Sequence, residues 1–140
     1  MISQLTVFLE NQEGRLANAV TTIGDANINM QALFLADTSD FGILRIFCDT
    51  PKKACEVLRE AGFQARLIDV VAVSVANKPG ELAKLMRYLS ENSVNVEYAH
   101  CFMRGEDAID VLKVDDPALE VKLTAAGFTV CKPEDVYALD

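Results

Sequence analysis

Two short stretches of this chain carry the residues best suited to hold a small charged molecule. Asn11-Gln-Glu-Gly14-Arg-Leu and Asn77-Lys-Pro-Gly80-Glu-Leu each place a glycine three residues after an asparagine. An asparagine amide can donate to a carboxylate and accept from an ammonium group. A glycine turn that opens a helix leaves backbone N–H groups available to an anion. The alternative is a plain strand-to-helix connection with an Asx-type cap.

The residues around these turns predict the elements that position them. Alternating apolar residues favour strands, and apolar residues at i, i+4 and i+7 favour a helix after the first turn. Thr50 and Pro51 are suited to the cap and the first position of a second helix, which Gly62 ends. In the first half we expect strands over 2–10, 28–36, 42–48 and 63–69, and helices over 16–23 and 51–61.

The second half of the chain repeats the first. Nine identical residues recur 66 positions later without a gap, and the pairs are Val7/Val73, Asn11/Asn77, Gly14/Gly80, Leu16/Leu82, Ala17/Ala83, Asn29/Asn95, Ile43/Ile109, Asp49/Asp115 and Pro51/Pro117. Ala-Gly-Phe then recurs at an offset of 65. A single offset kept over this length indicates an internal duplication.

The order strand, helix, strand, strand, helix, strand predicts an α+β fold of two ferredoxin-like repeats, each an antiparallel sheet with helices on one face. We expect residues 1–68 to form the first repeat and residues 69–140 the second. Several strands carry large apolar side chains on both faces, as Ile43 and Leu44 do. A sheet covered on one side should show a polar second face. We therefore expect the second face or the sheet edge to meet the other repeat or another chain, most simply in a homodimer.

The C-terminal residues echo the join between the repeats. Val136, Ala138 and Leu139 align with Val70, Ala72 and Val73 at the same offset of 66. Free termini are usually polar and mobile. The apolar pattern therefore predicts an ordered strand over 136–139 that adds to a sheet.

Composition excludes several classes of function. The net charge is −8 without a Lys/Arg-rich run, which argues against nucleic acid and anionic membrane as partners. Four scattered cysteines and one histidine do not predict a metal site, and no cofactor motif is present. Free thiols and the absence of a signal-peptide pattern at the N-terminus predict a cytoplasmic protein.

These motifs are similar to those of the ACT domain family, here as a tandem pair over nearly the whole chain. The resemblance rests on Asn-x-x-Gly-x-Leu after the first strand, on the asparagine that opens the second strand, and on the Ile-Leu-Arg-Ile-Phe third strand. It implies a regulatory protein that binds a free amino acid and acts on an enzyme or a transcription regulator. The implied ligand residues are Asn11, Glu13, Gly14, Arg15, Leu16 and Asn29 in one copy, and Asn77, Pro79, Gly80, Glu81, Leu82 and Asn95 in the other.

A catalytic role has little support in the sequence. A phosphate loop and a plausible Ser-His-Asp set are both missing. Acylphosphatases share the topology and use an arginine after the first strand, but Arg15 follows the turn glycine and the second copy has Glu81 there. A ligand-free protein-interaction module is the other alternative. Stabilisation by an amino acid would separate a sensor from such a module.

Overall fold

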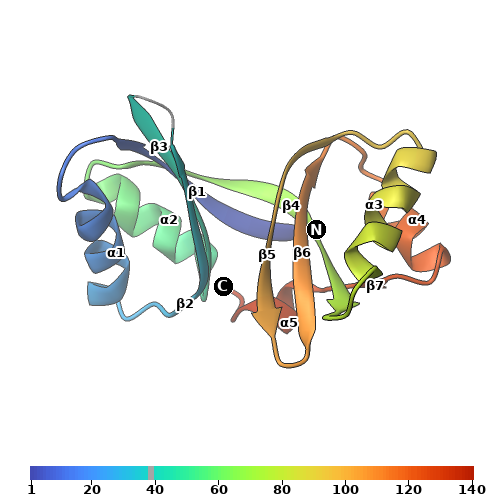
Figure 1. Cartoon of the computed structure of the whole chain (residues 1–140). Coiled ribbons are helices and arrows are strands. Elements are labelled where there is room, and N and C mark those ends of the chain that lie inside the picture. The colour runs from blue at the N-terminus through green and yellow to red at the C-terminus, as the bar shows by residue number, and fades with distance from the viewer. Residues whose placement is uncertain (38–39) are drawn as a thin grey trace. The chain divides into compact units, whose positions relative to one another are not determined.

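A computed structural model describes residues 1–37 and 40–140 of the chain. It contains two compact units (Figure 1). The first unit comprises Ser3–Ile68 together with Pro133–Asp140, and the second comprises Met1–Ile2 together with Asp69–Lys132. The chain passes from the first unit to the second between Ile68 and Asp69, where the duplication predicts a boundary. The last eight residues, however, belong to the first unit and not to the second repeat as we expected.

The first unit has the predicted order of elements. They are β1 (Ile2–Glu10), α1 (Arg15–Asp25), β2 (Met30–Asp37), β3 (Phe41–Cys48), α2 (Pro51–Glu60) and the beginning of β4 (Gln64–Ala76). The strands lie in the order β2-β3-β1-β4, and β3 pairs antiparallel with both β1 and β2. Figure 1 shows α1 and α2 on the same face of this sheet. The connection between the strands expected over 28–36 and 42–48 lies partly outside the described residues.

The second unit repeats this arrangement. The end of β4 is followed by α3 (Glu81–Glu91), β5 (Val96–Arg104), β6 (Asp107–Val114), α4 (Leu119–Ala125) and the two-residue strand β7 (Thr129–Val130). The order of its strands is β7-β4-β6-β5, which matches that of the first unit. Helices α3 and α4 share one face of the sheet (Figure 1). Each unit therefore has the ferredoxin-like topology that the sequence predicts.

Each unit has its own core between its sheet and its helices. In the first unit, alternate residues of β1 (Leu5, Val7 and Leu9) pack with Ile23 of α1 and Leu58 of α2. In the second, Val71 and Val73 pack with Leu85 of α3 and Leu123 of α4. Apolar residues recur at every second position of the strands and along one stripe of each helix. These two apolar faces pack against each other.

The C-terminal segment is ordered, but the predicted strand over 136–139 is wrong. Pro133–Val136 forms the short helix α5, Val136 and Tyr137 are buried, and Leu139 is 58% exposed. The alignment with Val70 fails because Pro133 stands where the first repeat has Leu67. Proline has no N–H to give to a sheet and favours the first position of a helix, where the acidic Glu134 and Asp135 also suit the helix dipole.

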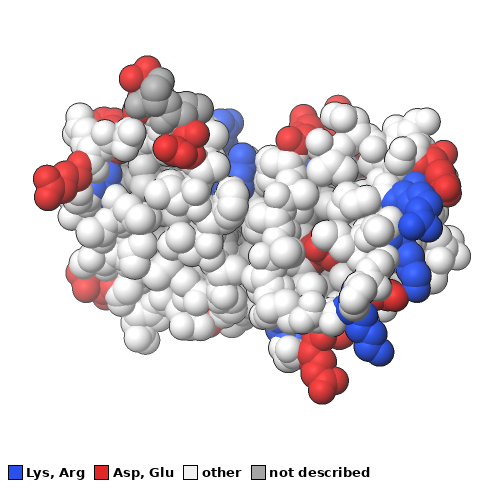
Figure 2. All heavy atoms as spheres, viewed as in Figure 1, with Lys and Arg blue, Asp and Glu red and all other residues white. Residues whose placement is uncertain are grey.

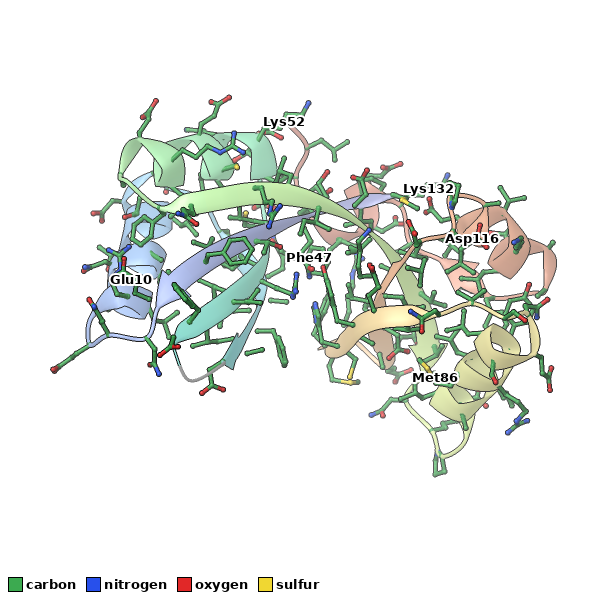
Figure 3. The ribbon with its side chains drawn as sticks, turned by 90° about the horizontal axis from the view of Figure 1, so that it is seen from above. Glu10, Phe47, Lys52, Met86, Asp116 and Lys132 are labelled. Atoms are coloured by element: carbon green, nitrogen blue, oxygen red, sulfur yellow. The ribbon has the colours of Figure 1, made fainter. Side chains whose placement is uncertain are left out.

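The predicted side-chain cap at Thr50 is also absent. Thr50 has a left-handed φ of 45° and makes no side-chain cap bond among the described residues. Asp140 supplies the carboxylate instead, and its Oδ2 accepts from the backbone N–H of Lys53 at 2.7 Å. Figure 3 shows Lys52 at this end of α2, and its Nζ donates to the Asp140 carbonyl oxygen at 3.4 Å. The C-terminal segment therefore caps α2.

Candidate functional site

The two glycine turns have the same backbone geometry. Gly14 has φ 85° and ψ −13°, and Gly80 has φ 87° and ψ −13°. A left-handed φ is readily adopted only by glycine, so both turns depend on this residue type. Each glycine immediately precedes a helix, α1 or α3, and neither helix has a side-chain cap within the described residues. The Asx-type cap that the sequence left open is therefore not formed.

The hydrogen bonds of the two turns also match residue for residue. In each turn the asparagine N–H donates to the residue before the third strand, the next N–H donates back to the end of the first strand, and the first helical N–H donates into the turn. The bonds are Asn11–Asp40 (3.1 Å), Gln12–Glu10 (2.8 Å) and Arg15–Gln12 (3.3 Å), against Asn77–Glu106 (3.4 Å), Lys78–Ala76 (2.8 Å) and Glu81–Lys78 (3.3 Å). Donors and acceptors all differ by 66, so the duplication extends to the backbone of the turns.

The predicted ligand side chains lie at the surface around these turns. Asn11 and Asn77 are exposed, as are Asn29 and Asn95 just before β2 and β5. The Asn29 carbonyl oxygen accepts from the N–H of Asp49 at 2.9 Å, so its backbone is tied to the end of β3. Leu16 and Leu82 are exposed by 36% and 45% on the first turns of their helices. Glu13, Pro79 and both glycines are exposed as well.

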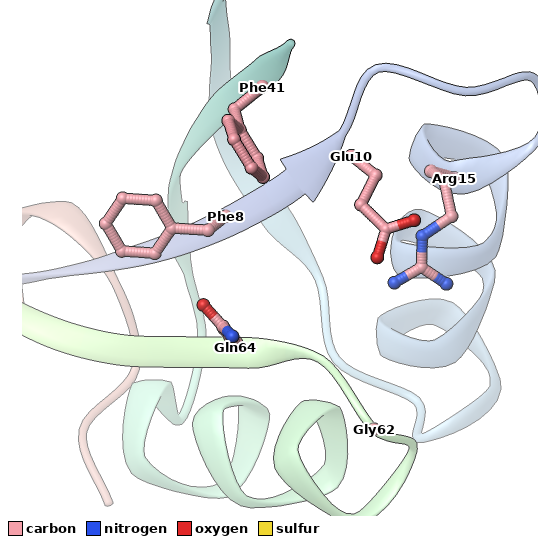
Figure 4. Close-up of a pocket in the computed structure, with 6 residues that line it drawn as sticks. All are labelled: Phe8, Glu10, Arg15, Phe41, Gly62 and Gln64. Carbon is pink, nitrogen blue, oxygen red and sulfur yellow. The ribbon is translucent and has the colours of Figure 1, made fainter.

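Arg15 is the predicted residue that enters a cavity in the first unit. The cavity has a volume of about 350 Å³ and is lined by Phe8, Glu10, Arg15, Phe41, Gly62 and Gln64 (Figure 4). The Arg15 guanidinium lies 4.6 Å from the centre of the Phe63 ring, and its Nε is buried without a hydrogen-bond partner in the described structure.

The second unit has a cavity at the corresponding place. It has a volume of about 320 Å³, and its lining includes Ser74, Ala76, Glu81, Gly127 and Thr129. These residues are the counterparts of Phe8, Glu10, Arg15, Gly62 and Gln64 at offsets of 66 or 65. Glu81 at this site forms an ion pair of 2.8 Å with Lys84. The two cavities therefore share a position in the fold but differ in charge.

Sequence reasoning did not single out Phe8, Glu10, Phe41, Gly62 or Gln64. It searched for residues that the two repeats have in common, whereas Phe8, Glu10, Phe41 and Gln64 differ from their counterparts. The cavity could have been found from equivalent positions beside the two turns at which the repeats differ, such as Arg15 and Glu81.

One charged group is buried away from both turns. Asp110 of β6 is 4% exposed, and its Oδ2 has no hydrogen-bond partner among the described residues. Burial raises the pKa of this carboxyl from its ordinary value near 3.8 to about 6. Its counterpart in the first unit is Leu44, a buried core residue.

Cys48 and Cys55 are not activated thiols. Burial, assisted by the nearby charge of Asp49, raises the pKa of Cys48 to about 12. Burial also raises the pKa of Cys55. A nucleophilic cysteine needs the thiolate form at neutral pH, which both shifts oppose.

The part of the chain that the structure describes has neither a candidate metal-binding cluster nor a helix of membrane-spanning length. There, no group of three or more His, Cys, Asp and Glu side chains could hold a metal ion. No helix of the same residues has the length and apolar character to cross a membrane.

Comparison with known proteins decides the family. The model of the ACT domain pair matches residues 1–126. The chain belongs to the ACT domain pair family. The structure of protein BT0572 from Bacteroides thetaiotaomicron is similar, with a TM-score of 0.90 and 34% identity over 96% of this chain and 94% of that one. A comparison with curated proteins gave no match.

The fold of this ACT pair also resembles a protein with a stated role. The ligand-free regulatory subunit of aspartate kinase from Thermus thermophilus matches with a TM-score of 0.65 and 19% identity, over 89% of each chain. At this identity the likeness concerns the fold alone. ACT domains are regulatory modules, so membership of the family favours a ligand-binding regulatory role over a catalytic one.

Proposed function

We propose that this ACT pair is a non-catalytic sensor that binds a free amino acid at its glycine turns. The observation that carries the proposal is the repeated turn, with two glycines of equal φ and three equivalent hydrogen bonds in each copy. Such identity of backbone geometry supports a shared requirement beyond connecting a strand to a helix. It is also consistent with the family to which the chain belongs.

The chemistry of the turns suits a zwitterion. The amides of the first helical turn lack intrahelical acceptors and lie at the positive end of the helix dipole, which favours a carboxylate. The asparagines before the glycines and before β2 and β5 are exposed and carry both donors and acceptors. An ammonium group can therefore be held beside the carboxylate. Asn11, Gly14 and Asn29, or Asn77, Gly80 and Asn95, are the contacts that we propose.

Regulation would pass through another protein or through self-association. A regulated enzyme or transcription regulator is the partner class that the ACT resemblance implies, and the cytoplasm is the compartment that we propose. The alternative is a ligand-free interaction module. The exposed apolar residues of β2, Leu33, Phe34 and Leu35, favour this alternative because such surfaces often mark contacts with proteins.

A ligand screen separates the two functions. We expect at least one of the twenty amino acids, at millimolar concentration, to raise the melting temperature of the chain and to give heat in calorimetry. A ligand at 100 times its Kd should stabilise the protein by about 2.7 kcal/mol. If none of the twenty shifts the melting temperature or gives heat, the sensor proposal is wrong and the interaction module is favoured.

Substitution of the glycines then locates the site. A Cβ at Gly14 or Gly80 meets no atom within 4 Å in the free protein, but a valine there must adopt a φ that strains it. We expect Gly14→Val or Gly80→Val to abolish binding at the affected turn and to lower stability by about 1–3 kcal/mol. Gly24, in the last turn of α1, is the matched control, because an added Cβ there also meets open space.

A further inference from the structure

The cavity behind Arg15 presents two opposite charges that are not used within the protein. Neither Arg15 nor Glu10 forms an ion pair within the described residues, although both line the same cavity. Figure 4 shows their charged groups turned toward one another at the end of β1. The two charged groups are therefore available to a ligand that carries both charges and enters this cavity.

Arg15 is prepared for a planar anion. Stacking on Phe63 at 4.6 Å occupies one face of the guanidinium, whereas its hydrogen bonds are made in the plane of the group. The contact therefore holds the side chain without using its donors. A buried Nε–H without an acceptor lowers stability in the free protein. The guanidinium lines the cavity, and Arg–carboxylate pairs are commonly bidentate.

The remaining wall of the cavity carries two aromatic rings beside Gly62 and the amide of Gln64. One ring is that of Phe8, and the Arg66 guanidinium lies 4.9 Å from its centre. The other is that of Phe41, which is 55% exposed and pairs with Glu10 across β3 and β1. The volume of about 350 Å³ lies near the lower end of the range of about 300–1,000 Å³ for small-molecule pockets. An apolar or aromatic side chain of modest size is complementary to these rings.

The second unit lacks this combination. Its counterpart of Arg15 is Glu81, which is paired with Lys84, and alanine and serine replace Glu10 and Phe8. The corresponding cavity therefore has neither an unpaired guanidinium nor counterparts of the Phe8 and Phe41 rings, although Phe128 lines it. A ligand that needs both would choose the first unit.

We infer that this cavity of the first unit binds an amino acid with an apolar or aromatic side chain. In the first unit the Arg15 guanidinium takes the carboxylate and Glu10 takes the ammonium group, in place of the turn amides and asparagines of the proposed function. The side chain of the ligand lies against Phe8 and Phe41. The inference rests on the proposed function for the ligand being an amino acid. It adds the unit that binds, the residues outside the turn motif, and the class of side chain.

Calorimetry of the whole chain with L-phenylalanine, L-leucine and L-glutamate tests the inference. We expect L-phenylalanine or L-leucine to bind at least tenfold more tightly than L-glutamate. L-Phenylalaninamide, which lacks the carboxylate, and 3-phenylpropionate, which lacks the ammonium group, should each bind at least tenfold more weakly than L-phenylalanine. A tenfold change in Kd corresponds to about 1.4 kcal/mol.

Variants of the two units provide the matched comparison. Arg15→Gln should raise the Kd at least tenfold, whereas Glu81→Gln at the equivalent position should change it less than twofold. If Arg15→Gln does not fold, Phe41→Ala tests the same cavity, because the exposed Phe41 side chain is not needed for folding. It should weaken L-phenylalanine binding severalfold.

The outcomes distinguish this inference from the proposed function. If an amino acid binds the wild type but Arg15→Gln and Phe41→Ala bind it unchanged, the cavity is not the site and the sensor function stands. Loss of binding in Glu81→Gln alone would place the ligand in the second unit and overturn the inference. If no amino acid binds the wild type, both are wrong.

Discussion

Asp110 makes the stability of the second unit depend on pH. It stands in the second unit on the same face of β6 as Leu112 and Val114, both of which are core residues. An unpartnered carboxylate there is unfavourable, and burial raises its pKa to about 6. Because the folded pKa is above the unfolded one, the folded state binds more protons between about pH 4 and pH 6. The contribution of this group to stability is therefore greatest below pH 4 and is lost as the pH rises through 6.

We predict that Asp110→Leu, which installs the residue type of Leu44, stabilises the protein at pH 7. The gain should be about 1–3 kcal/mol, because an unsatisfied buried group is removed. Urea unfolding at pH 5 and pH 7.5 should show a smaller pH dependence in the variant than in the wild type. Asp69→Leu, at an exposed position in β4, serves as the control. A variant that is less stable at pH 7 and keeps the wild-type pH dependence would contradict this account.

At the scale of elements, the C-terminal segment completes the first unit. The Tyr137 hydroxyl oxygen accepts from the Ser3 N–H at 2.9 Å, and its ring stacks with that of Phe47 at 6.5 Å and 16°. The Thr50 N–H donates to the Ala138 carbonyl oxygen at 2.7 Å, and the Ala138 N–H donates to Asp49 Oδ1 at 2.7 Å. These bonds join the segment to β1, to the end of β3 and to the start of α2.

We predict that Asp140→Ala lowers the free energy of unfolding by about 1 kcal/mol, the usual effect of removing a helix cap. Tyr137→Ala should lower it by about 3 kcal/mol, since a buried aromatic ring is lost. Leu139→Ala is the matched control because Leu139 is largely exposed. Denaturant titration monitored by circular dichroism measures all three. Equal stabilities for Tyr137→Ala and Leu139→Ala would show that the segment contributes nothing.

The edge strand β2 has an unusual surface for a monomer. It is the outermost strand of its sheet and exposes Leu33, Phe34 and Leu35 by 46%, 42% and 41%. In Figure 2 the lower half of the first unit is a broad, mostly uncharged area. Exposed apolar edge strands invite pairing with another chain. This feature supports the homodimer expected from the sequence.

At the scale of the whole molecule, we predict self-association through β2. Sedimentation velocity at micromolar concentration should show a species of about twice the 15.3 kDa chain mass. Leu33→Lys should shift the equilibrium to the monomer, because a charge would be buried at the contact. Val121→Lys, at a site on α4 that is 74% exposed, should leave it unchanged. A wild type that sediments only as a monomer would rule the dimer out.

The duplication made most of the fold predictable. Regular alternation placed β1 at Ile2–Glu10, and the turn glycine placed the start of α1 within one residue of the observed Arg15. The C-terminal segment was mispredicted because an alignment of apolar residues gave no weight to Pro133. The cavity behind Arg15 was not foreseen because it depends on residues from β1, β3 and the start of β4, which only the tertiary fold brings together. Shared spacing reveals common architecture, whereas differences between repeats carry specificity.

The composition of the first unit has a consequence for biosynthesis. Ser3–Ile68 emerge from the ribosome before Asp69–Lys132, but the residues that cap α2 and cover Phe47 are translated after Lys132. The domain that is made first is therefore finished last. During translation the nascent first unit exposes part of its apolar surface, and long-range closure between residues 3 and 137 must await the final stretch of the chain.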